Sequence, residues 1–505
     1  MTQANNDAIS IIPEPPSTPI LGWQRPSRQD PGFGFQRKEV SAPPQRRTHA
    51  IDAGSEGHLM TIAPTGSGKG RSAIIPTLLS YTGPVIVIDP KGENYQVTAR
   101  RRREMGQQVF KLDPFGVTGS ESNEFNLIDT IDVDDVGAYD QAMAMAELIA
   151  PGRSVSDPFW DESARLLLGA LILHVATARP PVLRNLSEVF YLINQSTEDI
   201  GFTIKEMTRS KHEMVRYMAS GFTATEAKVW ASILSTAKSS SGPFNGPAFN
   251  QISCRTEISL DGIVRGDPIS IYLVLPPEKL DSHGSLLRLW IGSLMDQICK
   301  RRHQVPEPTL FILDEAAQLG TLKQLRRAIT LLRGYGVRTW SFWQDLSQLQ
   351  ALYSDWETLY NNTRYIQAFG TTTHLLASKL TSLMNLPGDI DALRLGQDEL
   401  ILAEARRSAR VAIKPDYLND TCFRGRYDDN PFYQPLQAKP ESDPDPDPDP
   451  KPIPWRNKHR ATEQRLDELD REESKEIERQ DDNAQGDRTR AEDRTGHERD
   501  EDQPR

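Results

Sequence analysis

A glycine-rich turn between a short apolar strand and an amphipathic helix constrains the fold of this chain more than any other feature. The run HLMTIAP from His58 predicts a buried strand, and GRSAIIPTLLSY at 70–81 predicts the helix. Glycines in such a turn let successive backbone N–H groups point at phosphate oxygens, while the helix N-terminus and a lysine add positive charge. The turn therefore predicts a site for the phosphates of a nucleotide. The residues expected to bind there are Thr65, Gly66, Ser67, Gly68, Lys69, Gly70 and Arg71.

Two positions of this turn depart from the usual phosphate-binding pattern. Ala63 replaces the first glycine, and Gly70 stands where a serine or threonine hydroxyl usually binds Mg²⁺. The metal must therefore rely on other groups. A glycine-rich turn with a chance lysine would explain the same residues without a ligand, so a second motif is needed.

That second motif is a pair of carboxylates at the end of another buried strand, TLFILDE at 309–315. Buried strands normally avoid charge, so Asp314 and Glu315 are expected where the sheet edge meets a site. There Asp314 would hold Mg²⁺, and Glu315 would polarise the water that attacks a phosphate. The same pair would also suit the start of a helix at AAQLG, and the two roles can coexist.

Three further candidates lie between this motif and the end of the next strand, SFWQ. Gln344 ends that strand and could sense the γ-phosphate, or it could be only a polar strand end. Arg333 is a candidate arginine finger that would reach the nucleotide of a neighbouring subunit, and Arg338 is a second choice for that role. Surface arginines are common in loops, which is the alternative for both.

Strand and helix patterns alternate on both sides of a long helical stretch. PVIVID at 84–89 and QQVFKLD at 107–113 flank a helix at 95–105, which is the βαβ pattern of a parallel sheet. Apolar residues then recur with a helical period from about 135 to 244. Strand patterns return at 269–276, 309–315, 337–344, 364–370 and 399–405. We therefore predict an α/β fold with a mainly parallel sheet at 51–134 and 265–430, interrupted by an all-α inserted domain at 135–264.

The two ends of the chain differ from its centre in composition. Residues 1–50 are rich in Pro, Gln and Arg, and we expect them to be mostly disordered. The segment 440–505 begins with an Asp-Pro repeat, which favours neither helix nor sheet, so we expect an acidic spacer and a disordered charged tail. Residues 441–505 hold 22 acidic and 13 basic residues, which is −9 of the formal net charge of −11. The rest is nearly neutral, which leaves nucleic-acid binding at a local patch open.

No sequence feature predicts a membrane span or export. The longest apolar window, 166–176, is shorter than the roughly 18 residues that a membrane-spanning helix needs. The first residues lack the basic start and apolar stretch of a signal peptide. Cys254, Cys299 and Cys422 show neither paired spacing nor a histidine cluster, which argues against disulfides and a zinc site. We expect a soluble, cytoplasmic protein.

Together these motifs resemble the coupling-protein ATPases of type IV secretion and conjugation, the TraG-like family within the FtsK/HerA group of P-loop motors. The resemblance runs from near His58 to near Cys422. The segments that carry it are APTGSGKGRSAIIPTLL, VIVIDPKGENY, KLDPFG, DPFWDESARLLL, LSTAKSS, TLFILDEAAQLG and SFWQDLSQLQALYSDWETLYNN. It implies a RecA-like P-loop NTPase core, ATP and Mg²⁺ as cofactors, and a homohexameric ring that moves DNA or a relaxase–DNA complex to a secretion channel.

The resemblance also implies roles for single residues and partners. Gly66, Gly68 and Lys69 would bind phosphate, Asp314 and Glu315 would be the metal and catalytic carboxylates, and Gln344 would be the sensor. The segment 89–93 (DPKGE) matches another family segment beside the nucleotide. Implied partners are DNA bound through a relaxase, relaxosome proteins that contact the all-α domain, and channel components; single-stranded DNA is the first choice, and double-stranded DNA stays open.

One departure from the family and two rival functions remain open at this point. Family members usually begin with membrane helices and this sequence has none, so we expect a peripheral position at the cytoplasmic face of the inner membrane, with a membrane-anchored partner as one option. The rivals are a DNA translocase of the FtsK/HerA type without a link to secretion, and a non-hydrolysing adaptor that recruits substrates. The arginine run at 100–103 could contact DNA phosphates or be a solvated helix end.

Overall fold

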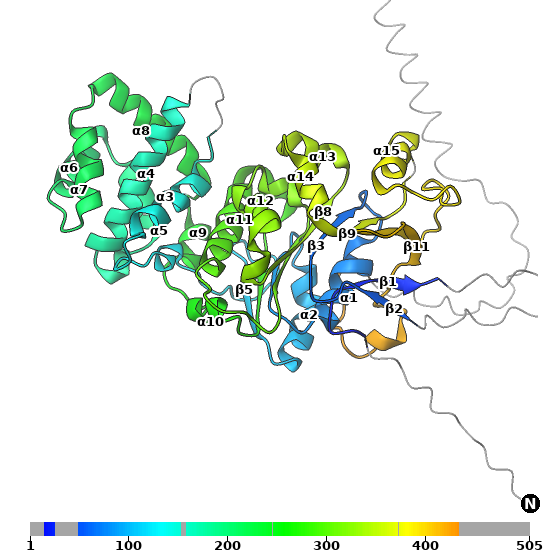
Figure 1. The fold of residues 1–505 in the computed structure, drawn as a ribbon. Coiled ribbons are helices and arrows are strands. Elements are labelled where there is room, and N and C mark those ends of the chain that lie inside the picture. Colours follow the sequence, from blue (N-terminus) through cyan, green and yellow to red (C-terminus); the bar gives the residue numbers. More distant parts are fainter. Residues whose placement is uncertain (1–14, 26–48, 153–157, 245, 372, 434–505) are drawn as a thin grey trace, which may run out of the picture. The chain divides into compact units, whose positions relative to one another are not determined.

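One large sheet organises the part of the chain that the structure describes. In this computed structural model the described residues are 15–25, 49–152, 158–244, 246–371 and 373–433. The sheet has the order β2-β1-β11-β10-β9-β3-β8-β7-β4-β6-β5 (Figure 1). The strands from β9 to β5 pair in parallel, and β10, β11, β1 and β2 extend the sheet with antiparallel pairs. The predicted α/β fold with a mainly parallel sheet is therefore confirmed.

Strands β3 to β10 fall close to the segments that the apolar runs predict, whereas β1, β2 and β11 are not predicted. Their bounds are β1 Ile20–Gln24, β2 Ala50–Asp52, β3 His58–Ile62, β4 Val85–Ile88, β5 Gln108–Leu112, β6 Ile269–Leu273, β7 Thr309–Leu313, β8 Val337–Trp343, β9 Thr363–Ala368, β10 Glu399–Glu404 and β11 Arg410–Ile413.

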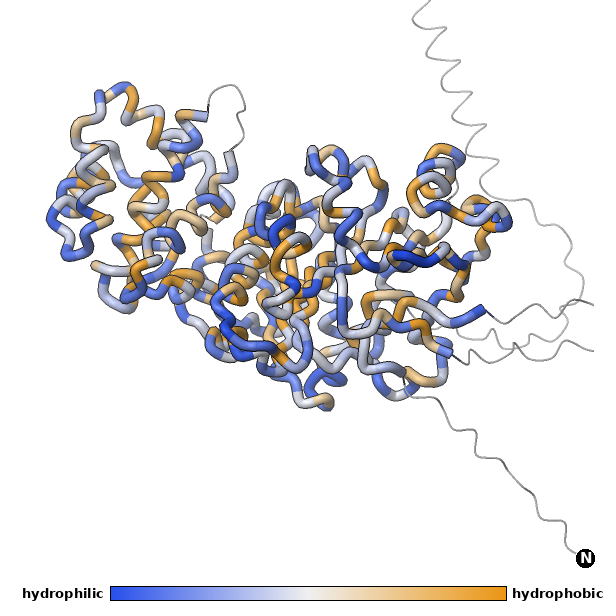
Figure 2. Tube along the Cα trace, viewed as in Figure 1, coloured by the Kyte–Doolittle hydropathy of each residue, from blue (hydrophilic) through white to orange (hydrophobic). Residues whose placement is uncertain are grey.

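Helices cover both faces of the sheet, which is why the central strands are apolar on both sides. In β4, Val85 and Val87 pack in the cluster that contains residues of α1 (Ile75–Ser80), while Ile86 and Ile88 pack in the cluster that contains α11 (Pro277–Ile298). Successive side chains of a strand point to opposite faces, so a strand buried on both faces needs β-branched residues throughout. Figure 2 shows hydrophobic residues along the central strands and the helices beside them.

A long all-helical stretch separates β5 from β6. Between these strands the described residues contain helices and no strand. The helices are α3 Ala138–Ile149, α4 Phe159–Ala178, α5 Leu186–Asn194, α6 Thr197–Met207, α7 Glu213–Thr223, α8 Ala227–Ser241, α9 Pro247–Ile252 and α10 Leu260–Arg265, with short 3-10 turns at Leu127–Thr130, Pro181–Leu183 and Gly242–Phe244. The division of the chain into separate domains stays a prediction, because the apolar core continues from these helices into the sheet layer.

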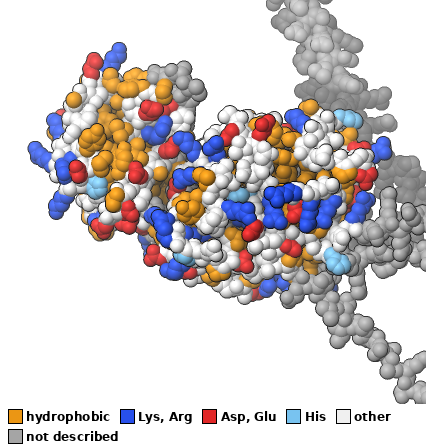
Figure 3. All heavy atoms as spheres, viewed as in Figure 1, with side chains coloured by type: hydrophobic (Ala, Val, Ile, Leu, Met, Phe, Trp, Pro, Cys, Tyr) orange, Lys and Arg blue, Asp and Glu red, His pale blue; other side chains and the backbone are white. Residues whose placement is uncertain are grey.

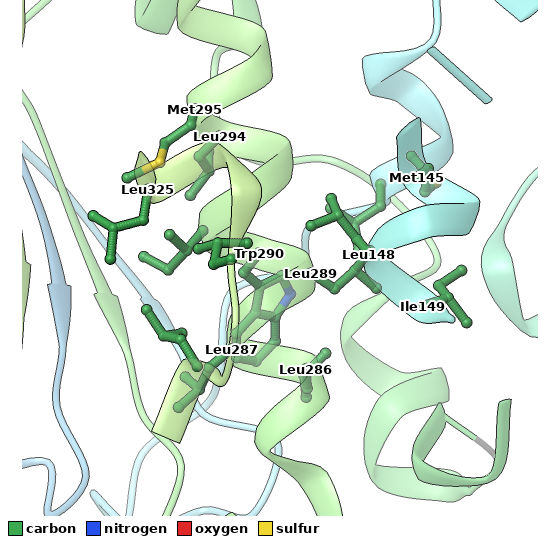
Figure 4. Close-up of a cluster of buried hydrophobic side chains, with 14 of the residues drawn as sticks. Met145, Leu148, Ile149, Leu286, Leu287, Leu289, Trp290, Leu294, Met295 and Leu325 are labelled. Carbon is green, nitrogen blue, oxygen red and sulfur yellow. The ribbon is translucent and has the colours of Figure 1, made fainter. Parts of the chain in front are cut away.

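Helices α3 and α11 join the two regions through close packing. Leu148 of α3 faces Leu289 and Trp290 of α11, all buried (Figure 4). A Cβ on Gly292 would clash with the side chain of Leu148, so the glycine permits the close approach of the two helices. This contact is a part of the single apolar core rather than a flexible link.

The remaining helices follow the later strands and lie along the sheet. They are α2 Glu93–Glu104, α12 Lys323–Leu331, α13 Leu346–Leu352, α14 Trp356–Asn361 and α15 His374–Met384, with 3-10 turns at Ala316–Leu319, Leu332–Tyr335 and Thr421–Phe423.

The expectation of a mostly disordered 1–50 segment is wrong for residues 20–24. These residues form β1, which pairs with β11 and β2 and buries Ile20, Leu21 and Trp23. The partner strand β11 lies almost 400 residues away in sequence, so no local pattern could reveal the pairing. Residues 1–14 and 26–48, and the acidic spacer and tail at 440–505, lie outside the described residues.

The arginine run at 100–103, for which contact with DNA phosphates and a solvated helix end were both open, is not uniformly exposed. Arg102 is completely buried and donates hydrogen bonds to Ser270 Oγ at 2.8 Å and to the carbonyl of Gly83 at 2.7 Å, and it also contacts the carbonyl of Tyr81. Arg100 forms ion pairs with Glu104 and Asp428. Arg102 therefore has a structural role at the end of α2.

We predict that Arg102→Met lowers the free energy of unfolding by about 3 kcal/mol, because the substitution leaves buried carbonyls without their donor. Arg103→Met is the matched control, since Arg103 is exposed, and it should change stability by less than about 0.5 kcal/mol. Chemical denaturation monitored by circular dichroism measures both. Equal midpoints for the two variants would contradict the structural role of Arg102.

Candidate functional site

The glycine-rich turn joins the carboxyl end of β3 to a helical segment. This segment starts with a short π-helix at Gly70–Ile74 and continues as α1. Gly66 and Gly68 have φ angles of 79° and 87°, which side chains disfavour. The backbone N–H of Ser72 donates to the carbonyl of Gly68 at 2.8 Å, so the helical hydrogen bonds begin directly at the turn. N–H groups at such a start have no partner within the helix and suit an anion.

Parallel pairing places four candidate residues beside one another. Strand β8 lies between β3 and β7, and all three run in the same direction. Their carboxyl ends therefore meet at one edge, where Lys69, Gln344 and the Asp314–Glu315 pair follow β3, β8 and β7. The Lys69 ammonium lies 2.9 Å from Asp314 Oδ1 and also pairs with Glu315 Oε1. Gln344 Nε2 donates to Glu315 Oε2 at 2.9 Å.

These contacts set the charges at the edge of the sheet. Burial alone would lower the pKa of Lys69, but the charge of Asp314 and the hydrogen bond to Glu315 outweigh it, so the pKa is raised. Burial raises the pKa of Asp314, and the nearby charge of Lys69 opposes this rise without cancelling it. The lysine is therefore charged and is held by two carboxylates.

Glu315 has an unusual backbone conformation. Its φ and ψ angles of 57° and 53° lie in the left-handed region, which non-glycine residues adopt rarely and at a cost of about 1 kcal/mol or more. This conformation turns the chain sharply between β7 and the 3-10 turn at Ala316–Leu319. The strained position directs the Glu315 side chain toward Lys69 and Gln344.

Asp89 extends the row of polar strand ends by one strand, because β4 pairs with β7. Its buried carboxylate accepts hydrogen bonds from the N–H groups of Tyr95 and Asn94, at 2.8 and 3.2 Å, at the start of α2. Burial raises the pKa of Asp89 to about 7, although these N–H groups oppose the shift. The segment 89–93 thus fixes the N-terminus of α2 beside the carboxylates of β7.

Most of the other predicted binding residues line a cleft beside the turn. The cleft has a volume of about 730 Å³ and is open to solvent. Its walls are Pro64–Gly68 and residues 71–72 of the turn and helix, together with residues 369–371, 393, 395–398, 414–416 and 433. Arg71 binds both carboxylate oxygens of Asp416, at 2.8 and 2.7 Å, and Gly70 starts the helix without a side chain to offer.

Lys414 is a residue of this cleft that the sequence did not point to. Its buried ammonium donates to the carbonyls of Ser67 and Gln397, at 3.2 and 3.0 Å, and lies 4.7 Å from the centre of the Phe369 ring. Burial lowers the pKa of Lys414. Lys414 follows the short strand β11 in a segment with no recognisable motif. Its position in the cleft therefore becomes clear only from the pairing of β10 with β11.

Arg333 and Arg338 do not join the cluster around Lys69. Both lie near the start of β8, at the opposite edge of the sheet. Arg333 is exposed and pairs with Glu56. Arg338 is buried and donates to the carbonyls of Ala53, Gly54 and Gly57 at 2.6–2.8 Å, so its interpretation as an arginine finger is wrong.

Within the described residues, no group of three or more His, Cys, Asp or Glu side chains forms a metal site. In the same part of the chain, no helix is long and apolar enough to cross a membrane.

Comparison with known proteins gives consistent matches. A family model described as type IV secretory system, conjugative DNA transfer matches residues 33–379. The conjugal transfer protein TraG from Escherichia coli is 24% identical over 398 residues, which cover 73% of this chain and 61% of TraG. Protein VirD4 from Agrobacterium fabrum is 26% identical over 312 residues, which cover 60% of this chain and 45% of VirD4. The chain thus spans about three fifths or less of the length of these relatives.

A solved structure shares the fold. The plasmid coupling protein TrwB, in complex with ADP and Mg²⁺, superposes with a TM-score of 0.56 at 16% identity, covering 71% of this chain and 85% of that chain. This likeness agrees with the predicted α/β fold and its mainly parallel sheet.

We predict that Lys69 and Asp314 stabilise the fold as a coupled pair. Lys69→Met leaves two partly buried carboxylates without their cation and should lower the free energy of unfolding by about 1–3 kcal/mol. Asp314→Asn added to Lys69→Met should recover part of that loss, because it removes one uncompensated charge. A double-mutant cycle measured by chemical denaturation tests the pair, and additive effects would contradict the coupling.

Proposed function

Because this chain belongs to the type IV secretory system conjugative DNA transfer family, we propose that it is an ATP-driven coupling protein that brings DNA or a relaxase–DNA complex to a type IV secretion channel. One observation carries the proposal. Lys69, the Asp314–Glu315 pair and Gln344 are far apart in sequence but converge within hydrogen-bonding and ion-pair distance beside a phosphate-binding turn. A non-hydrolysing adaptor would not need this convergence.

We infer that Thr65–Gly70 binds the phosphates of ATP. The left-handed glycines curl the backbone, and the unpartnered N–H groups of the helix start favour anionic oxygens. Lys69 exchanges its carboxylate partners for the β and γ phosphates when nucleotide binds. That exchange releases Asp314 and Glu315 from the lysine. Nucleotide binding therefore also frees the two carboxylates for their own roles.

The residues at the edge of the sheet also fit Mg²⁺. Mg²⁺ prefers oxygen ligands and is usually held by one or two carboxylates together with phosphates and water. Asp314 supplies such an oxygen at the end of β7, and this role matters because Gly70 lacks a hydroxyl. When bound, the ion neutralises negative charge on the phosphates. The relative TrwB was crystallised with ADP and Mg²⁺, which supports the same pair of ligands here.

Glu315 is the proposed group that orients and polarises the attacking water. Its left-handed backbone and its hydrogen bond from Gln344 hold the carboxylate in one position. Gln344 is therefore well placed to report the state of the γ-phosphate to β8. Arg71 contributes by fixing Asp416 in the wall of the cleft and does not need to touch phosphate.

We propose a homohexameric ring in which Arg333 acts on the site of the neighbouring subunit. Arg333 lies at the opposite edge of its own sheet, so it cannot complete the site of its own chain, but it is exposed and available to a partner. Relaxosome proteins and channel components are the further proposed partners, and the cytoplasmic face of the inner membrane is the proposed location.

Substitutions of Glu315 and of Lys69 distinguish nucleotide binding from ATP hydrolysis. Glu315→Gln should keep nucleotide binding and lower DNA-stimulated hydrolysis about a hundredfold or more, because only the water-polarising group is lost. Lys69→Ala should lose both. Lys228→Ala, on the exposed surface of α8, is the control. Fluorescent-nucleotide binding and phosphate release measure the two steps. Equal, slow hydrolysis by the unsubstituted protein and both variants would favour the adaptor.

Mixing variants tests the ring. Arg333→Ala should keep nucleotide binding but hydrolyse ATP at least about a hundredfold more slowly. Mixtures of Arg333→Ala and Glu315→Gln chains should regain activity, because some sites then combine an intact Glu315 with an intact arginine from the neighbour. Arg326→Ala, which removes another exposed arginine, is the control. Full activity of a strictly monomeric protein, or no recovery in mixtures, would refute the shared site.

A further inference from the structure

A second cavity lies within the all-helical stretch between β5 and β6. It has a volume of about 870 Å³, which is within the size range of sites that hold small ligands or peptide side chains. Helix α4 forms its floor, α6 and the turn before α7 form one wall, and the turn before α3 forms another. The lining residues on which the argument depends are His174, Phe202, Lys205, Glu206, Arg209 and Lys211.

His174 marks the floor of the cavity as a binding position. Only 1% of the residue is exposed, and within the described residues neither ring nitrogen has a hydrogen-bond partner. Buried polar groups normally have partners, so an unpartnered imidazole that lines a cavity points to a missing ligand. Burial, together with the charge of Arg179, lowers the pKa of His174 to about 4, so the ring is neutral near pH 7. A neutral imidazole offers one donor and one acceptor.

The wall of the cavity is cationic and preorganised. Lys205, Arg209 and Lys211 form no ion pair with any carboxylate in the described part of the chain, whereas Glu206 pairs with Arg179 at 3.8 Å. Arg216 holds the turn by donating to the carbonyls of Ser210 and Lys211, at 2.8 and 2.9 Å. Figure 3 shows Lys and Arg side chains at this end of the helical stretch, where α6 and α7 lie, beside hydrophobic side chains. Arg209 and Lys211 are therefore presented by a fixed turn, and Lys205 by helix α6.

The shape and the rim favour a peptide over a nucleic acid. Phe202 is 59% exposed at the rim, with the Lys205 ammonium 5.7 Å from its ring centre, so an apolar side chain could pack beside a charged one. Asp134 and Glu206 also line the cavity, so its lining is not uniformly cationic, as contact with a continuous phosphate backbone would require. A peptide can alternate carboxylate, apolar and amide groups, and its main-chain N–H and C=O groups supply the donor and the acceptor that a neutral imidazole can bond.

We propose that this cavity binds an acidic peptide segment of a partner protein. Lys205, Arg209 and Lys211 pair with its carboxylates, Phe202 packs against a neighbouring apolar side chain, and His174 exchanges hydrogen bonds with its main chain. The inference extends the proposed function, since it gives the chemistry by which the helical stretch would recognise a protein cargo.

Fluorescence anisotropy with the full chain, without nucleotide, tests the site. The probe is a fluorescein-labelled peptide with the repeat Gly-Glu-Leu-Glu, and the matched peptide has glutamine in place of each glutamate. We expect saturable binding of the acidic peptide only. Lys205→Glu together with Arg209→Glu should weaken it about tenfold or more, whereas Lys228→Glu, a charge reversal on the exposed surface of α8, should change it less than about twofold.

His174 is tested separately, because its loss could affect folding. His174→Gln keeps a polar group and His174→Leu does not, so Leu should weaken peptide binding more than Gln at unchanged circular dichroism. If His174→Leu fails to fold, the charge-reversal pair still decides the proposal. No saturable binding up to millimolar peptide, or equal binding of the glutamine peptide, would overturn it. So would charge-sensitive binding of a thymidine oligonucleotide in place of the peptide. Basal ATP hydrolysis, measured in parallel, reports failure of the ATPase proposal independently.

Discussion

The parallel pairing of β3, β8 and β7 is the constraint on which the rest of the structure depends. Its register pairs Ile62 with Trp343 and Leu313 with Ser341, so these strands end at one edge of the sheet. A slip of one residue would reverse the side chains of a strand between the two faces, and apolar layers on both faces oppose this. The chain can therefore bring residues 69, 315 and 344 together without any local sequence signal that links them.

At this edge of the sheet, opposite charges face one another and part of the backbone is strained. One lysine faces two carboxylates, and the second of these is held in a left-handed backbone conformation. Strain of this kind persists only where the surroundings over-determine it, and here β7, the 3-10 turn after it and the hydrogen bond from Gln344 do so. The arrangement makes the position of Glu315 depend on Lys69, and hence on whatever anion the lysine contacts.

The sequence predicted those parts of the fold whose signals are local. Apolar runs predict β3 to β10, and the motifs predict that the turn at 63–70 and the carboxylates of β7 share one site. Other features depended on contacts between distant segments. Arg102 and Arg338 appear in sequence as ordinary surface cations, but both are buried against backbone carbonyls. The position of β1 depends on its pairing with β11. The position of Lys414 depends on β11 as well, because Lys414 directly follows that strand. Burial and long-range pairing, rather than residue type, decided each of these.

The insertion point of the helical stretch explains how one chain can hold both a sheet-edge site and a separate cavity. β5 and β6 are neighbours in the sheet, pairing from Gln108 with Ile269 to Leu112 with Leu273, so residues between them leave and return without disturbing the strand order. α11 then follows β6, covers the sheet and packs on α3, with Gly292 giving Leu148 room. Because this contact is dense, sliding of α3 along α11 would be costly. At this contact the helical stretch is a rigid extension of the sheet layer, so a peptide held near α4 would be carried with the sheet rather than on a loose tether.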